Sequence, residues 1–197
     1  MKNILRIALV ASLFIISACE NTELDLLENP NEVTPENAEL NLLYNRVVLD
    51  FVDFVDEASD ETMPYVRMVA MTGGDIYQNA DGPTSFDFLW SEAYAVLLPD
   101  LNLIIETATE GGQNVHAGSA KIMKAYVLFT LVDLFGDIPY SEAGKGVEVP
   151  SPKADDAASV YQAGLALLDE AIKDLQTQGP RPTNDLYYGG TNTNWLK

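Results

Sequence analysis

The chain has 197 residues, of which 47% are hydrophobic and 21% charged, so it can bury a core and is not disordered throughout. Its 11 Lys and Arg stand against 30 Asp and Glu, which gives a net charge of −19 at pH 7. Such a surface repels phosphate backbones, which argues against nucleic acid as a partner. One Cys and one His are too few for an internal disulfide, a zinc site or a Cys/His catalytic centre.

The first 18 residues are typical of a secretory signal peptide. Lys2 and Arg6 precede an apolar run over residues 7–16, which is too short to span a membrane as a helix of about 20 residues. Ser17 and Ala18 then lead to Cys19, where cleavage is expected. We therefore expect residues 1–18 to be removed from the mature protein.

The segment that ends at Cys19, residues 16–19, resembles a bacterial lipobox. In that motif the thiol is lipidated, and two or more acyl chains at about 0.8 kcal/mol per buried CH₂ form a lasting membrane anchor. The alternative is a free Cys at the end of an ordinary signal peptide. The acidic residues that follow, Glu20, Glu23 and Asp25, resemble the surface-export signal of Bacteroidetes lipoproteins. Residues 19–33 are therefore expected to be an acylated Cys and an acidic tether.

Apolar spacing predicts helices over most of the remaining chain. The first begins with Thr34 as N-cap and Pro35 at its first position. Its buried face is expected to hold Leu40, Leu43, Tyr44, Val47, Val48, Phe51, Val52 and Val55. A shorter helical stretch is predicted over 62–72, and a polar, glycine-rich loop over 73–85.

Three further helices are predicted. One covers 86–109, interrupted at Pro99 and ended by the glycine pair at 111–112. The next, 117–135, is apolar nearly all round and should be central, with Gly136 as its C-terminal cap. Another opens at Asp155, with apolar residues at Val160, Tyr161, Leu165, Leu168, Ile172 and Leu175. After a loop over 179–193, a further helix is expected to begin at Trp195.

No segment alternates apolar and polar residues for long enough to predict a strand. The fold class is therefore all-α, with tetratricopeptide-like helix pairs and long irregular loops. Small residues suited to close helix crossings are Ala120, Ala125, Gly164 and Ala171.

Several segments together resemble the SusD/RagB family of outer-membrane lipoproteins. The most specific is Val132-Asp-Leu-Phe-Gly-Asp-Ile-Pro-Tyr140, followed by Glu142-Ala143. Weaker likenesses lie at 29–34, at the W…Y…N-x-I pattern of 90–105, and at 161–175. The resemblance implies that residues 34–197 form a SusD-like helical domain. Family members are longer, so we expect this to be the N-terminal part of such a domain, with the C-terminal part missing.

No catalytic motif is present, and the resemblance implies a binding protein and not an enzyme. Paired carboxylates could serve a glycosidase, but 30 acidic residues supply many accidental pairs. The acidic run Asp53–Glu61 lacks the spacing of an EF-hand, so a solvated helix face is favoured; no cofactor is expected, with Ca²⁺ left open. His116 is predicted to lie in a surface loop.

The glycine-rich loop is the predicted ligand contact. Sugars bind to aromatic faces and to planar amides and carboxylates, and this loop and its end supply Asp75, Tyr77, Gln78, Asn79, Asp81, Phe86 and Asp87. In the starch-binding member of the family, the corresponding region carries glycan contacts. The alternative is an ordinary polar loop with Phe86 and Phe88 in the core.

The resemblance implies a lipid-anchored, surface-exposed outer-membrane protein. It would bind oligosaccharide and deliver it to a SusC-like TonB-dependent transporter. Two alternatives stay open: a peptide-binding RagB-like lipoprotein, and a helical-repeat scaffold that binds no nutrient.

Overall fold

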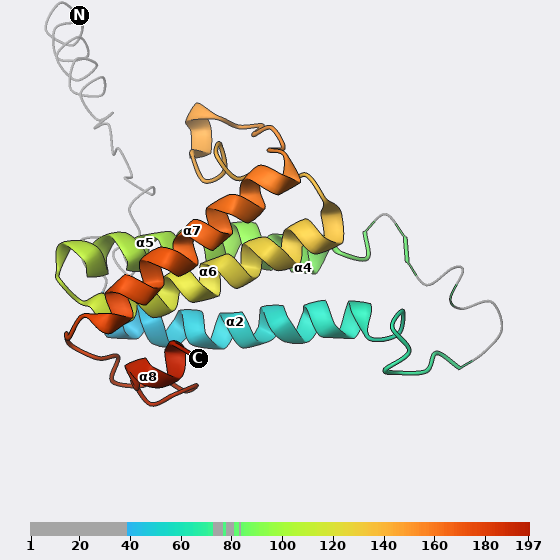
Figure 1. Ribbon diagram of the computed structural model, residues 1–197. Helices are drawn as coiled ribbons and strands as arrows, with labels where there is room; N and C mark the ends of the chain where they lie inside the picture. Colours follow the sequence, from blue (N-terminus) through green and yellow to red (C-terminus); the bar gives the residue numbers. More distant parts are fainter. Residues whose placement is uncertain (1–38, 73–76, 78–80, 83) are drawn as a thin grey trace, which may run out of the picture. The chain divides into compact units, whose positions relative to one another are not determined.

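Helix α2 (Leu40–Thr62) is amphipathic, and its buried residues Leu40, Tyr44, Val47, Val48 and Phe54 lie on one face. The computed structural model of the protein describes residues 39–72, 77, 81–82 and 84–197 (Figure 1). The predicted N-cap, Thr34 with Pro35, lies outside the described residues. Within α2, Phe54 is fully buried whereas Val52 is 47% exposed, so the predicted face was wrong at these two positions. Phe54 continues the spacing from Val47, and Val52 falls off that line.

The helix predicted over 62–72 does not form. The chain leaves α2 at Thr62 and passes through turns over residues 63–69. Pro64 has no N–H to continue the helical hydrogen bonds. Arg67 has a φ of 63°, in the left-handed region. Apolar spacing in this segment was therefore overridden by local backbone chemistry.

The helical run over residues 87–110 is interrupted just before Pro99, by a change of pitch, whereas the prediction placed the interruption at Pro99 itself. It consists of α4 (Asp87–Ser91), the wide π-helical segment η1 (Glu92–Leu97) and α5 (Leu98–Glu110). The N–H of Leu98 bonds to the carbonyl of Ala93, five residues back. Pro99 has no N–H to donate to the carbonyl four residues earlier. The wider π-helical turn just before it accommodates this missing hydrogen bond.

By length and composition the run Asp87–Glu110 could cross a membrane. It packs instead against α2 and against α6 (Asn114–Phe135), and its residues Leu97, Leu101 and Ile104 are fully buried. We therefore assign it to the core of the helical unit.

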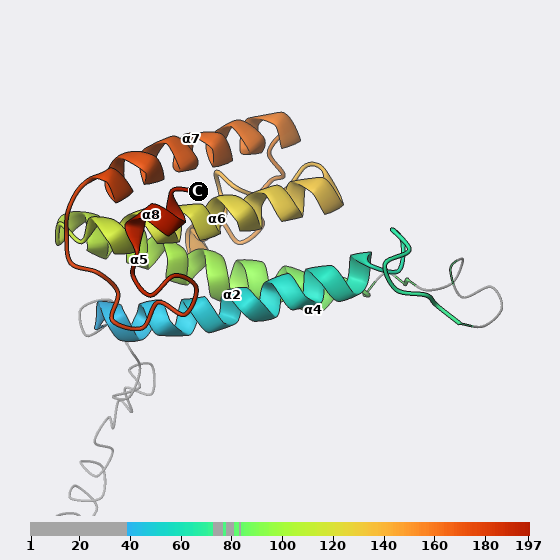
Figure 2. The same cartoon turned by 60° about the horizontal axis from the view of Figure 1, so that its bottom comes forward.

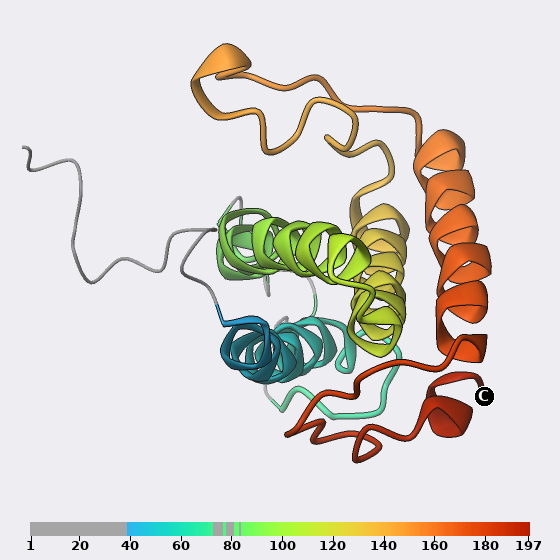
Figure 3. The same cartoon turned by 90° about the vertical axis from the view of Figure 1, so that its left-hand side faces the viewer.

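Helix α6 is central, as predicted, and packs against α5 on one side and against α7 (Ala157–Gln176) on the other. Figure 3 shows α2, α5, α6 and α7 following one another when viewed along the helices. In the described residues the strand-like pairing is an isolated bridge between Ile138 and Asp155. The all-α prediction is thus confirmed, with one 3₁₀ turn, η2 (Gly146–Glu148), in the long connection before α7.

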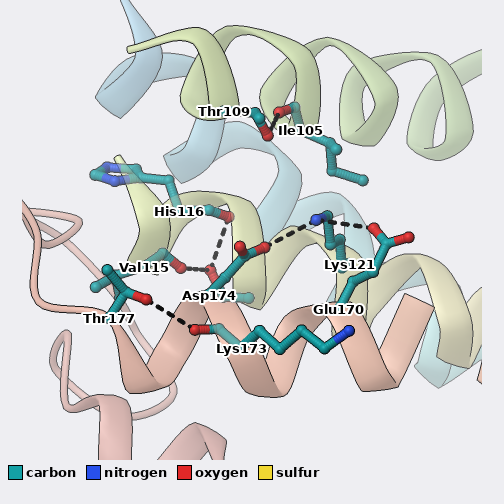
Figure 4. A network of polar contacts seen from close by, with 10 residues as sticks. Ile105, Thr109, Val115, His116, Lys121, Glu170, Lys173, Asp174 and Thr177 are labelled. Carbon is teal, nitrogen blue, oxygen red and sulfur yellow. Dashed lines mark hydrogen bonds and ion pairs between the residues drawn. The ribbon is translucent and has the colours of Figure 1, made fainter. Parts of the chain in front are cut away.

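The α6–α7 contact depends on small residues. Gly164 of α7 faces the ring of Phe129, and a methyl group at this glycine would overlap the ring. Gly118 of α6 faces Leu175 in the same way, with 2.7 Å from an added Cβ to Leu175 Cγ. Lys121 of α6 bonds to Asp174 at 2.8 Å and to Glu170 at 3.0 Å across the interface (Figure 4).

Helix α7 corrects two predictions. It begins at Ala157, with Asp156 as N-cap accepting from the Ser159 N–H, and not at Asp155. Its buried face is Val160, Gly164, Ala171 and Leu175, whereas Tyr161, Leu165 and Ile172 are exposed. Both stripes have helical spacing, and the one with the small residues is the one that approaches α6.

The C-terminal segment returns from α7 to α2 (Figure 2). There the Tyr187 hydroxyl donates to the Val48 carbonyl at 2.9 Å. The short α8 (Asn192–Trp195) ends at Trp195, so this residue does not begin a helix as predicted. The Trp195 ring N–H donates to the buried Asp185 carboxylate at 2.8 Å, which fixes α8 to the loop before it.

Candidate ligand-binding surface

The structure describes four of the seven predicted contact residues: Tyr77, Asp81, Phe86 and Asp87. Asp75, Gln78 and Asn79 lie outside the described residues, as does the predicted lipidation site Cys19.

Tyr77 is half-buried and contacts the segment that follows α2. The Arg67 guanidinium lies 4.2 Å from the centre of its ring, and its hydroxyl accepts a hydrogen bond from the Met71 N–H at 3.0 Å. Asp81 is exposed and accepts a hydrogen bond from the Tyr65 hydroxyl, which raises the pKa of Tyr65. Tyr77 and Asp81 therefore each contact the segment 65–71.

Phe86 and Asp87 face different surroundings. The Phe86 ring packs edge-on against Phe135 at 5.5 Å, at the margin of the core. Asp87 is exposed in the first turn of α4. The next residue, Phe88, is 55% exposed, so it does not fill the core. Of the described aromatic side chains in this stretch, Phe88 offers the most accessible ring.

An exposed apolar segment next to this loop was not predicted. Residues 65–69 include Tyr65, Val66, Met68 and Val69, all exposed, with Met68 at 75%. Exposed apolar groups that adjoin one another often mark an interaction site. The sequence does contain a signal for this exposure, since these residues follow Pro64, which prevents a second helix from burying them.

A pocket of about 310 Å³ opens between α5, α6 and the connection that follows α6. We call it the α5–α6 pocket. It is lined by Tyr94, Leu98, Pro99, Asn102, Leu103, Glu106, Lys124, Pro139, Tyr140, Ala143 and Gly144. Its size is at the lower end of ligand pockets, about 300–1,000 Å³. Reasoning from the sequence missed this pocket, because its walls come from three segments far apart in the chain.

The segment after α6 fixes one wall of the pocket. Gly136 has a φ of 77°, which allows the chain to turn away from α6. The Asp137 carboxylate accepts from the Ala157 N–H, and Asp155 accepts from the N–H groups of Tyr140 and Ser141. The hydrogen bond from the Ser141 hydroxyl, followed by those from the N–H groups of Ser141 and Tyr140, lowers the pKa of Asp155. The Gly-Asp-Ile-Pro-Tyr sequence thus positions Pro139 and Tyr140.

Lys124 is the cation of the α5–α6 pocket. Its ammonium donates to Asn102 Oδ1 at 2.7 Å and lies 5.6 Å from the centre of the Tyr140 ring. Burial lowers the pKa of Lys124, against the attraction of Glu170. The Tyr94 hydroxyl donates to the Pro139 carbonyl at 2.7 Å, and burial raises the pKa of Tyr94.

His116 is not in a surface loop, contrary to the prediction. It lies in the first turn of α6 with 1% of its surface exposed. Its Nε2 is 3.1 Å from Asn41 Oδ1, and its ring meets the edge of the Tyr44 ring at 5.4 Å. Because Asn41 Oδ1 only accepts, we assign the proton to Nε2. The glycine pair before it suggested a loop, but α6 begins earlier than predicted, at Asn114.

No metal centre emerges from the part of the chain that the structure describes. There, no three His, Cys, Asp or Glu side chains are grouped closely enough to hold a metal ion. The acidic run of α2 was predicted to be a solvated helix face, and its residues Asp53, Asp56 and Asp60 are exposed.

Comparison with known proteins places this fold in a family. A family model described as "Starch-binding associating with outer membrane" matches residues 30–197. The chain belongs to this SusD-like family. A search of curated proteins returned no match.

A solved structure supports the SusD-like assignment. The chain is similar to the crystal structure of a SusD/RagB family protein from Bacteroides thetaiotaomicron, with a TM-score of 0.65 and 26% sequence identity. The match covers 81% of this chain and 36% of that one. The chain therefore spans about a third of the length of this relative.

Proposed function

We propose that this chain belongs to a lipid-anchored outer-membrane protein that binds oligosaccharide at the cell surface and delivers it to a SusC-like TonB-dependent transporter. The observation that carries the proposal is the family match over residues 30–197, whose description names starch binding and the outer membrane. The lipobox-like sequence that ends at Cys19 supports the anchor. The protein acts by binding and not by catalysis, and needs no cofactor.

We place ligand contacts on the loop 73–88. Its described part supplies groups typical of sugar binding: the half-exposed ring of Tyr77, the exposed ring of Phe88 and the carboxylates of Asp81 and Asp87. The neighbouring exposed segment 65–69 contacts Tyr77 and Asp81. Ligand that binds the loop would therefore meet this segment too.

The carbohydrate proposal is tested by affinity electrophoresis of the purified chain in gels that contain starch, cellulose derivatives, mannan or pectin. Retardation by at least one polysaccharide is expected. If no polysaccharide retards the protein while a peptide mixture such as casein hydrolysate binds in calorimetry, the peptide-binding alternative replaces it.

The anchor is tested separately with Cys19→Ser. The unaltered protein should incorporate labelled palmitate and sediment with outer membrane, whereas the variant should do neither. Palmitate incorporation by the variant would contradict the assignment of Cys19.

A further inference from the structure

The α5–α6 pocket shares no residue with the loop 73–88 or with the segment 65–69. Its walls are partly apolar, from Leu98, Pro99 and Leu103, and partly polar. A concave site with apolar walls and a few convergent polar groups is the usual form of a small-ligand site.

The polar groups of the pocket leave hydrogen-bonding capacity for a ligand. An ammonium carries three donors, and in the described residues Lys124 makes one side-chain hydrogen bond, to Asn102 Oδ1. Among the described residues Lys124 has no salt-bridge partner, although Lys121, one turn earlier, has two. A partly desolvated ammonium is costly unless its donors are satisfied. A ligand oxygen would satisfy one of them.

Both signs of charge line the pocket, and this restricts the ligand class. Glu106 supplies a carboxylate that accepts hydrogen bonds, Lys124 supplies donors, and the Asn102 amide can supply both. An anionic ligand would face Glu106 and a chain with a net charge of −19, and a cationic ligand would face Lys124. Neutral hydroxyl groups can bond to all three side chains without such a conflict.

We propose that the α5–α6 pocket is a subsite for a sugar ring of a neutral oligosaccharide, with hydroxyls bonded to Asn102, Glu106 and Lys124. The C–H faces of the ring would pack on Leu98, Pro99 and Leu103. The inference rests on the proposed carbohydrate-binding function and names a site that is distinct from the loop.

The test is a titration of the chain, labelled at Leu methyl groups, with maltotriose, cellotriose, mannotriose and the dipeptide Ala-Ala. At least one trisaccharide should shift the methyl resonances of Leu98 and Leu103. In Lys124→Met, which keeps the length of the side chain, the affinity measured from these shifts should fall about tenfold, as expected for one hydrogen bond to a charged group. Asn102→Ala should weaken binding in the same direction.

Lys173→Met, on the exposed side of α7, is the matched control and should bind as the unaltered chain does. Thermal melting of each variant verifies the fold; if Lys124→Met does not fold, Asn102→Ala at the exposed end of the same pair carries the test. Equal affinity of the folded pocket variants and the control would overturn the inference.

The remaining outcomes separate this inference from the proposed function. Trisaccharide binding that weakens in Tyr77→Ala but leaves the pocket methyls unshifted overturns the pocket and retains carbohydrate binding. If Ala-Ala shifts the methyl resonances of Leu98 and Leu103 and the trisaccharides do not, the sugar assignment is overturned. If polysaccharides retard the chain but no trisaccharide shifts the methyl resonances of the pocket, the sugar assignment of the pocket is also overturned. If every carbohydrate experiment fails, both this inference and the proposed function are overturned.

Discussion

The apolar residues at the α6–α7 contact are buried, whereas those of the segment that follows α2 are exposed. Between α6 and α7, glycines allow close approach, Leu175 is buried, and Lys121 bonds to two carboxylates. After α2, a proline and a left-handed Arg67 prevent a helix, so Val66 and Met68 stay exposed. Buried apolar contacts stabilise the first region, whereas the exposed groups of the second are free to meet a ligand or partner.

This contrast predicts where substitutions affect folding and where they affect binding. Changes at the α6–α7 contact should lower the free energy of unfolding. Changes at Tyr77 and at the exposed residues of the segment 65–69 should leave it nearly unaltered and act on affinity. The expected effects decrease from the helix contact to the loop.

The largest effect is expected from Gly164→Leu. The side chain would occupy the space of the Phe129 ring, and overpacking of this kind costs about 3 kcal/mol. Urea denaturation measures the change. Ala166→Leu, on the exposed side of α7, is the matched control and should change stability little. Equal stability of the two variants would contradict the close approach of α7 to α6.

Lys121→Met should destabilise the same contact by about 1 kcal/mol. The cost is modest because Asp174 and Glu170 are partly exposed and can be hydrated after the ammonium is lost. Burial opposes the charge of Lys121, but hydrogen bonds to these two carboxylates outweigh it and raise its pKa. Denaturation at low and high salt should show a smaller salt dependence in the variant than in the unaltered chain.

His116 should make the α2–α6 contact sensitive to pH. Burial lowers the pKa of His116, so the unfolded chain binds the proton more readily and stability falls as pH drops through about 6.5. His116→Gln, which can still donate to Asn41, should lose less stability between about pH 7.5 and 5.5. Melting temperatures at several pH values measure the difference.

The carboxylates that titrate in the opposite sense do not obscure this comparison. Burial raises the pKa of Glu61, Glu92 and Asp100, which favours the folded state as pH falls. These groups are the same in both proteins and cancel in the difference. An identical pH profile for His116→Gln would show that His116 is not buried as a neutral ring.

Of these substitutions, Tyr77→Ala should lower the free energy of unfolding least, and its main effect should be on ligand affinity. The contacts of Tyr77 with Arg67 and the Met71 N–H lie near the surface, so the loss of stability should stay below about 1 kcal/mol. Oligosaccharide affinity in calorimetry should weaken by about 1–2 kcal/mol if the ring contacts the ligand. Tyr77→Phe, which keeps the ring, is the control. A large loss of stability with unchanged affinity would assign Tyr77 to the fold alone.

The sequence predicted the fold well where one residue type has one structural consequence. Pro99 interrupts its helix, Gly136 ends α6, and Gly164 marks a helix crossing, because each follows from backbone geometry or from the absence of a side chain. Helical spacing alone could not tell which of the two apolar stripes of α7 is covered. That choice depends on α6, more than 20 residues away in the chain.

Composition predicts a ligand-binding loop at 73–88, and this stays a prediction. The contact of Arg67 with Tyr77 depends on a left-handed residue that no pattern indicated. The α5–α6 pocket was missed because Asn102, Lys124 and Tyr140 each have an ordinary place in a helix or turn. Their common wall exists only after the helices pack.

Amide hydrogen exchange of the chain, with and without the polysaccharide that retards it most strongly, tests the division between scaffold and binding surface most directly. We expect slower exchange in 63–88 and in the walls of the α5–α6 pocket, 98–106 and 139–144, with unchanged exchange in α7. Slower exchange confined to α7, or no change anywhere while the polysaccharide is bound, would contradict the account.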